Sequence, residues 1–254
     1  MKRILLLALM AGLLTACGNE DGSTNEESTE TDGEQNASQE TAEEQDQKEE
    51  TEETAKSAAD ASEIIDEAIS AWGDTSSYEA RQTFTISSED TQTVVRTITT
   101  QSEQDEVKIE VDNGSNVITH YVIDGDHFTY QDGSINPEKE NIDMTGSTYG
   151  EIIKKLESFK EGKASNTDAG YEIRYPIESA EDASLFLDDE ILSSLDDANS
   201  LNGLITLHFN DEYQYTGGKL TLTVETEGRE INLISNIDLS RIGDIEVIEK
   251  PKNM

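Results

Sequence analysis

The stretch DASEIIDEAISAWGDTSSYEARQTFTISSE, residues 60–89, changes its hydrophobic period halfway along. The first half places apolar residues at helical spacing: Ala61, Ile64, Ile65, Ala68, Ile69 and Trp72. Gly73 follows as a helix end. The second half alternates in steps of two, with one face made of Tyr78, Ala80, Gln82, Phe84 and Ile86. The stretch therefore predicts an amphipathic helix that leads directly into a half-buried strand.

The chain beyond this stretch reads as more strands and two further helices. Four strand patterns follow closely, at residues 91–101, 106–111, 117–123 and 127–131, with hairpin turns such as Asp124-Gly125-Asp126 between them. Helical patterns lie at 144–162 and 180–195, on either side of a strand pattern at 170–177. Three strand patterns end the chain, at 203–210, 213–226 and 230–240. This order predicts an α+β fold with one antiparallel sheet and about three helices on one face.

The composition limits the class of partner. The 254 residues carry a formal net charge of −38, and the 18 lysines and arginines are scattered. Binding to nucleic acid needs clustered basic residues, so the sequence argues against it. The same charge disfavours direct adhesion to an anionic bilayer. Hydrophobic residues make up only 33% of the chain, and this deficit is concentrated near the N-terminus.

The N-terminus has the pattern of an export signal. Met1-Lys2-Arg3 is basic, ILLLALMAGLL (residues 4–14) is apolar, and small residues precede Cys17, the sole cysteine. The sequence LTAC resembles the bacterial lipobox. That resemblance implies cleavage after residue 16 and a diacylglyceryl thioether on Cys17, with acyl chains such as palmitate. The alternative is an ordinary secretory signal followed by an incidental thiol.

Residues 17–58 are predicted to form a disordered acidic tether after the lipidated cysteine. Beyond Cys17 they contain no aromatic residue and no aliphatic residue larger than alanine, so they cannot bury enough apolar surface to fold. A flexible chain of this length spans about 35 Å. We expect one folded domain over residues 59–254.

The folded part resembles the LolA/LppX-type carrier fold of bacterial lipoproteins, and most closely LolA-like lipoproteins of Gram-positive bacteria. The resemblance is carried by the opening helix with SYEARQTFTI (77–86), by the hairpin YVIDGDHFTYQDG (121–133) and by the ending VETEGREINLISNIDLSRIGDIEVIEKP (224–251). It implies an incomplete barrel, helices on its concave face, and a hydrophobic cavity that holds acyl chains. Candidate lining residues are Trp72, Phe84, Ile86, Tyr121, Phe128, Leu185, Phe186 and Leu187, each of which also suits an ordinary core.

Enzymatic chemistry finds little support in the sequence. The chain has no GxSxG elbow and no glycine-rich phosphate loop, and Cys17 is used for the lipid. The histidines, His120, His127 and His208, are not at zinc-ligand spacing, although His120 and His127 could meet across the hairpin at Gly125. We therefore expect no enzyme, no cofactor and no resident metal.

Two functions remain from these patterns. The first is a membrane-anchored extracytoplasmic lipoprotein that binds or carries an apolar or lipidated ligand. The alternative is an accessory interaction lipoprotein of the cell envelope that works through its surface, without a ligand cavity.

Overall fold

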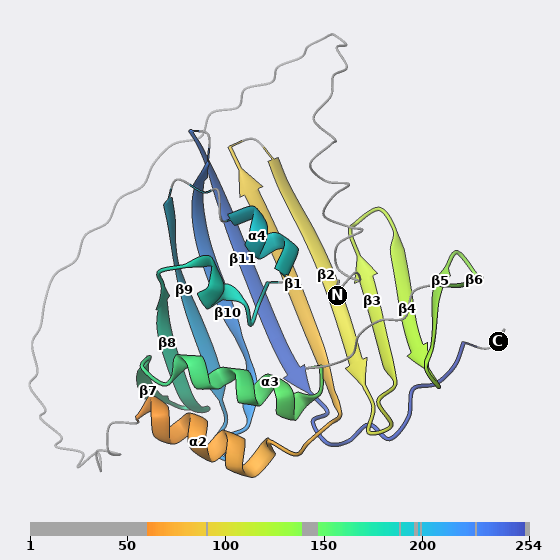
Figure 1. The fold of residues 1–254 in the computed structure, drawn as a ribbon, viewed down its shortest axis with the longest axis horizontal. Helices are drawn as coiled ribbons and strands as arrows, with labels where there is room; N and C mark the ends of the chain where they lie inside the picture. Colours follow the sequence, from red (N-terminus) through yellow and green to blue (C-terminus); the bar gives the residue numbers. More distant parts are fainter. Residues whose placement is uncertain are drawn as a thin grey trace, which may run out of the picture.

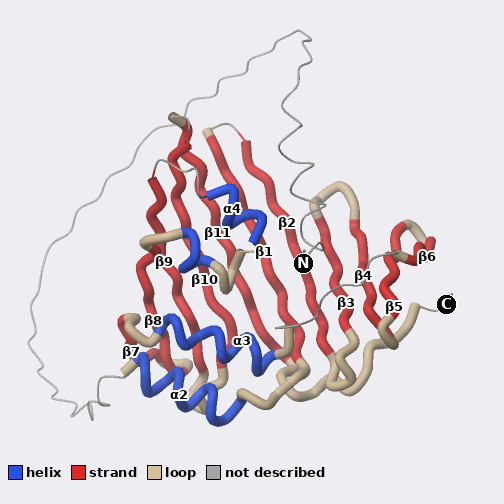
Figure 2. Tube along the Cα trace, viewed as in Figure 1, coloured by secondary structure: helices blue, strands red, loops and turns tan. Residues whose placement is uncertain are grey.

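The computed structural model describes residues 60–89, 91–138, 147–187, 189–195, 198, 200–226 and 228–251. The predicted signal peptide (1–16), Cys17 and the tether lie outside these residues. The described part is one open antiparallel sheet of eleven strands with short helices on one of its faces (Figures 1 and 2). This confirms the predicted fold class.

The elements follow one another in a simple order. The helical segments are α2 (Ala61–Trp72), α3 (Tyr149–Lys155) with the 3-10 turn η1 (Leu156–Phe159), the 3-10 turn η2 (Ala180–Ala183) and α4 (Asp189–Leu195). The N-terminal strands are β1 (Tyr78–Ser88), β2 (Thr91–Gln101), β3 (Val107–Asp112), β4 (Val117–Ile123), β5 (Asp126–Gln131) and β6 (Ser134–Pro137). The C-terminal strands are β7 (Lys163–Thr167), β8 (Gly170–Ile177), β9 (Ser200–Phe209), β10 (Tyr215–Thr226) and β11 (Arg229–Ser240).

The first and last strands join the sheet in its middle. The strand order is β6-β5-β4-β3-β2-β1-β11-β10-β9-β8-β7, so two meanders meet where β1 pairs with β11. This pairing runs without a register shift from Glu79 opposite Ser240 to Ser88 opposite Ile231. Since β6 and β7 lie at opposite ends of this order, the sheet of the described residues is not closed into a barrel.

Two details differ from the prediction. The short strands β6 and β7 were not expected, because their sequences SINP and KASNT show no hydrophobic alternation. The helix expected over residues 180–195 is divided into η2 and α4. Between them the Phe186 carbonyl accepts a hydrogen bond from Gln82 Nε2 in β1, at 3.2 Å, which ties the backbone to the sheet.

The register assigns every strand residue to one of two faces. Residues directly opposite each other share a face, and neighbours along a strand alternate. Starting from Phe84, which packs in the core below the helices, we call this side the helix face and the other the outer face. Phe84 pairs with Val95 in β2 and with Ser235 in β11, so these residues also lie on the helix face.

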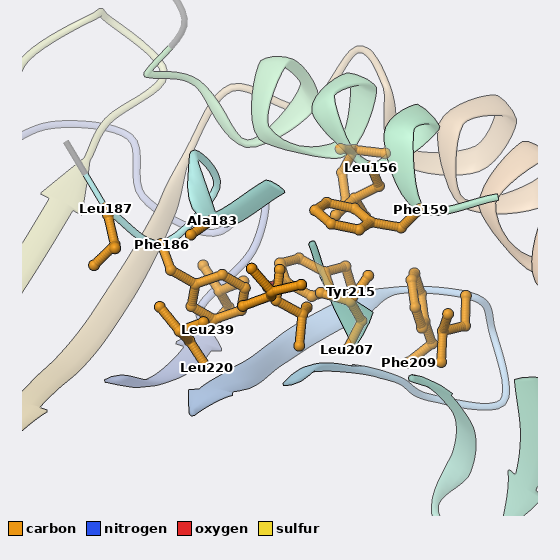
Figure 3. Packing of buried hydrophobic residues seen from close by; sticks show 14 of the residues in the cluster. Leu156, Phe159, Ala183, Phe186, Leu187, Leu207, Phe209, Tyr215, Leu220 and Leu239 are labelled. Atoms are coloured by element: carbon orange, nitrogen blue, oxygen red, sulfur yellow. The ribbon is translucent and has the colours of Figure 1, made fainter. Parts of the chain in front are cut away.

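The core is densest beneath α2 and α3. Ile65, Ala68, Ile153 and Leu156 are each 0% exposed. Figure 3 shows Leu156 and Phe159 facing sheet residues that include Tyr215, Leu207 and Phe209. The N-terminus of α3 also lies against the end of α2, where the Gly150 amide donates to the Thr75 carbonyl at 2.7 Å. These contacts fix the two helices over one end of the sheet.

A second, smaller cluster lies on the outer face. It contains Tyr121, Ile123, Phe128, Ile245 and Ile248. The C-terminal segment reaches this cluster through two hydrogen bonds: the Glu103 amide donates to the Ile245 carbonyl, and the Ile248 amide donates to the Glu106 carboxylate at 2.7 Å.

Two buried tyrosines give a matched test of the core. Tyr149 Oη donates to the Tyr215 carbonyl at 2.8 Å, whereas the Tyr215 hydroxyl has no hydrogen-bond partner among the described residues. Tyr149→Phe removes the hydrogen bond from the hydroxyl to this buried carbonyl and should lower the free energy of unfolding by about 1–3 kcal/mol. Tyr215→Phe should leave it unchanged or raise it. Urea denaturation of both variants measures this, and equal losses would contradict the assignment.

Candidate functional site

Charged strand residues are almost all on the outer face. By register, the outer face carries Glu79, Arg81, Arg96, Lys108, Glu110, Asp112, Asp126, Lys163, Glu172, Arg174, Lys219, Glu225, Glu230 and Asp238. On the helix face of the described strands, the ionisable residues other than tyrosine are Arg229, at the tip of β11, and the pair His120 and His127. The helix face is therefore an uncharged surface within a strongly acidic chain.

Burial is less complete at the other end of the helix face, near α4. Leu185, Ile191, Leu192 and Leu195 pack against the main core but remain partly exposed. Figure 1 shows α4 in front of β11 and β1, well separated from α2 and α3. The described apolar residues of α4 are thus all partly exposed, whereas α2 and α3 combine fully buried residues such as Ile65 and Ile153 with partly exposed ones such as Ile152.

A buried polar bridge positions the segment that leads into α4. Gln82 Nε2 donates both to the Phe186 carbonyl and to Ser235 Oγ, at 3.2 and 2.9 Å. Ser235 is fully buried and Phe186 almost so. Because unpaired polar groups are costly in such surroundings, this bridge favours one position of the segment over the sheet.

The structure divides the candidate lining residues between two clusters. Phe84, Ile86, Leu185, Phe186 and Leu187 belong to the main cluster on the helix face. Trp72 also packs against that cluster, but its Nε1–H donates to the Glu212 carbonyl in the β9–β10 hairpin. In contrast, Tyr121 and Phe128 stack on each other on the outer face, with ring centroids 5.1 Å apart. They are therefore not brought together with the other candidates.

His120 and His127 do meet across the β4–β5 hairpin. His120 Nδ1 and His127 Nε2 are 3.4 Å apart, and the ring planes differ by 24°. The ring centroids are 5.6 Å apart. This exceeds the nitrogen separation by about twice the distance from a ring centre to its nitrogen, so the nitrogens face each other almost directly. Burial and then the charge of His127 lower the pKa of His120, while the Glu138 carboxylate acts to raise it.

This geometry suits a shared proton better than a metal ion. A tetrahedral zinc ion with bonds of about 2.0–2.1 Å would also place two nitrogens about 3.3 Å apart, but their lone pairs would point at the metal and not at each other. No group of three metal-ligating side chains occurs among the described residues. His208 lies on the outer face instead, with Nε2 3.7 Å from the Glu172 carboxylate.

The outer face has one hollow of a different character. It has a volume of about 500 Å³ and lies over β9 and β10. Its lining is mainly neutral and polar, with Glu225 as its acidic member: Ser200, Asn202, Gly203, Leu204, Thr221, Thr223 and Glu225. Leu204 is 37% exposed, so this hollow presents one apolar side chain to solvent.

The His120 environment predicts a specific dependence of stability on pH. The pKa of His120 is lowered in the folded state, so the unfolded chain takes up the proton first as the pH falls through about 6.5. Folding stability should therefore decrease between pH 7.5 and 5.5, by about 1.4 kcal/mol for each unit of pKa difference. His120→Gln should lose less stability over this range than the wild type. His208→Gln, a substitution on the outer face, should behave as the wild type in urea denaturation at both pH values.

None of the described helices combines the length and apolar character needed to cross a membrane.

No family model and no curated protein matches this sequence. Among solved structures, the chain is similar to LprF from Mycobacterium bovis, with 13% identity, a TM-score of 0.45, and coverage of 77% of this chain and 99% of that one. It is also similar to a LolA superfamily protein from Nitrosomonas europaea, with 7% identity, a TM-score of 0.28, and coverage of 77% and 97%. These values are too low to establish a shared function.

Proposed function

We propose that this protein is an extracytoplasmic lipoprotein of a Gram-positive bacterium, anchored to the cell membrane through a lipidated Cys17. Its folded part binds an apolar or lipidated ligand between the helix face of the sheet and α4. The acidic tether of residues 17–58 holds this binding domain away from the membrane surface.

One observation carries the binding proposal: the helix face of the described strands has no charged residue except Arg229 at the tip of β11, and the apolar residues of α4 remain partly exposed on it. A surface kept free of carboxylates in a chain of net charge −38 is suited to an apolar occupant, which charges would exclude. Leu185, Leu192 and Leu195 remain available to add contacts with such a ligand. Each methylene group that a ligand buries there contributes about 0.8 kcal/mol.

Neutral polar residues on the helix face indicate which kind of ligand this surface fits. Thr93 and Thr99 of β2 lie on the helix face and are partly exposed, whereas Thr97 and Gln101 are buried. The two exposed hydroxyl groups can donate to ester or hydroxyl oxygens of a ligand without adding charge. The surface therefore fits a lipid with neutral oxygen-containing groups better than a pure hydrocarbon.

A second function is an accessory role through the surface. The observation that favours it is the hollow on the outer face with the exposed Leu204, a feature that ligand carriage on the helix face does not use. The partner in this case would be another protein of the cell envelope.

The anchor has a direct test. In a Gram-positive host fed an alkyne analogue of palmitate, the wild-type chain should incorporate the label and sediment with membranes. Cys17→Ser should lose the label completely and leave the membrane fraction, because no other thiol is present to be acylated. Retention of the label by the variant would contradict lipidation at Cys17.

The ligand site is tested by native mass spectrometry of the full chain carrying Cys17→Ser, purified gently from lipid-rich cells. We expect adducts with masses of acyl lipids. Adding Leu192→Asp places a charge beside α4 and should reduce the bound fraction at least tenfold, while Leu204→Asp on the outer face should not change it. Circular dichroism checks that each variant keeps its sheet.

If the protein whose sole substitution is Cys17→Ser shows the mass of the polypeptide without adducts, the proposal of ligand binding is contradicted. The accessory role through the surface is then favoured. An equal loss of adducts from Leu192→Asp and Leu204→Asp would contradict the placement of the ligand near α4.

A further inference from the structure

We infer that the ligand of the helix face is an amphiphile with an anionic headgroup, phosphate or carboxylate, and that the His120–His127 pair receives this headgroup. This inference rests on the proposed function, and it specifies the chemical class of the ligand.

The pair is connected to the α4 region by uncharged residues. One row of the helix face runs across four strands from Gln82, which contacts the Phe186 carbonyl, through Thr97 and Val111 to Ile118. The next row runs through Ala80, Thr99, Ile109 and His120. With strands about 4.8 Å apart, the three steps from β1 to β4 cover about 14 Å. Thr97 and Val111 of the first row are buried, whereas the residues of the second row are partly exposed. An acyl chain that starts near α4 can therefore follow the second row to the pair without meeting a charged strand residue.

The pair can supply a positive charge on a face where, among the described strand residues, Arg229 at the tip of β11 is the other cation. When both imidazoles are neutral, one facing nitrogen donates to the other across 3.4 Å, so a proton already lies between them. With His120 Nδ1 as the donor, an added proton binds the outward Nε2 of His120, which then donates hydrogen bonds while the pair carries a single charge. A second proton would place two like charges side by side, which is unfavourable. One bound anion and one proton therefore match each other.

The neighbouring groups set how easily this proton is taken up. His120 in β4 faces His127 in β5. Thr129, on the same face of β5, donates a hydrogen bond from Oγ1 to Glu138 Oε1 at 3.1 Å. The Glu138 carboxylate favours protonation of the pair, whereas burial and the mutual repulsion of the two imidazoles oppose it. Glu138 itself is exposed, at the edge of the site. An anionic headgroup beside the pair adds a second favourable charge and should bind together with a proton.

The location of the pair is the reason to assign it to a ligand. The histidine on the outer face, His208, lies among charged residues, where Glu172 is its neighbour. His120 and His127 instead lie on the face from which other strand charges are absent, apart from Arg229 at the tip of β11. An anion on the outer face would meet many carboxylates, but at the pair it meets Glu138 as the carboxylate that acts on His120.

The test compares two probes with the same acyl chain in the full chain carrying Cys17→Ser. Myristoyl lysophosphatidylglycerol keeps its phosphodiester charge between pH 7.5 and 5.5, and monomyristoylglycerol is neutral. We expect the Kd of the anionic probe to fall at least tenfold from pH 7.5 to 5.5, and the Kd of the neutral probe to change less than twofold. Fluorescence or calorimetric titration below the micelle concentration measures both.

Variants locate the effect. His120→Gln combined with His127→Gln should abolish the pH dependence for the anionic probe. His208→Gln, the matched outer-face variant, should retain the full dependence. All proteins carry the same residues 1–58, so any binding to that segment cancels in the comparison.

The outcomes separate the inference from the proposed function. If neither probe binds, both are overturned. If both probes bind with equal affinity and without dependence on pH or on the histidine pair, the proposed function stands and this inference is overturned. If inorganic phosphate alone binds the pair and displaces the anionic probe at equal concentration, the site takes a free anion, and the assignment to a lipid headgroup is overturned.

Discussion

The pairing of β1 with β11 is the constraint on which the rest of the structure depends. It joins the first and last strands of the described residues, and so it connects the two meanders into one sheet. Because the register is unbroken over this pair, the alternation that begins at Tyr78 extends across the sheet as far as the register shift between Tyr215 and Gly217 of β10. A shift by one residue would turn every apolar residue of one meander to the outer face.

The separation of an apolar face from a charged face follows from that shared register. With one consistent alternation, Phe84, Ser235 and Leu220 all lie below the helices, while the strand charges lie on the other face. The helices then cover this surface unequally. Those at one end, α2 and α3, complete a core with residues such as Ile153 and Leu156, whereas α4 leaves its leucines partly exposed. The difference between the two ends makes the surface near α4 a site and the surface below α3 a core.

Much of this arrangement could be predicted from local patterns. The helix of Ala61–Trp72, most of the strands and the order of the elements follow from hydrophobic period and turn residues. The faces of distant strands could not be predicted, because alternation alone gives two equivalent choices. Tyr121 and Phe128 alternate as regularly as Phe84, but the register through β2, β3 and β4 turns them to the outer face. For the same reason, the sequence places His120 near His127 but does not show that both lie on the uncharged face.

The central claim is that an apolar ligand occupies the helix face between α4 and the sheet. A crystal structure of the protein purified from its own membranes, without delipidation, tests it most directly. We predict elongated density along the row from Ala80 to His120, in contact with Leu192 and Leu195. A structure in which protein side chains fill this space completely, with α4 packed as closely as α3, would contradict it.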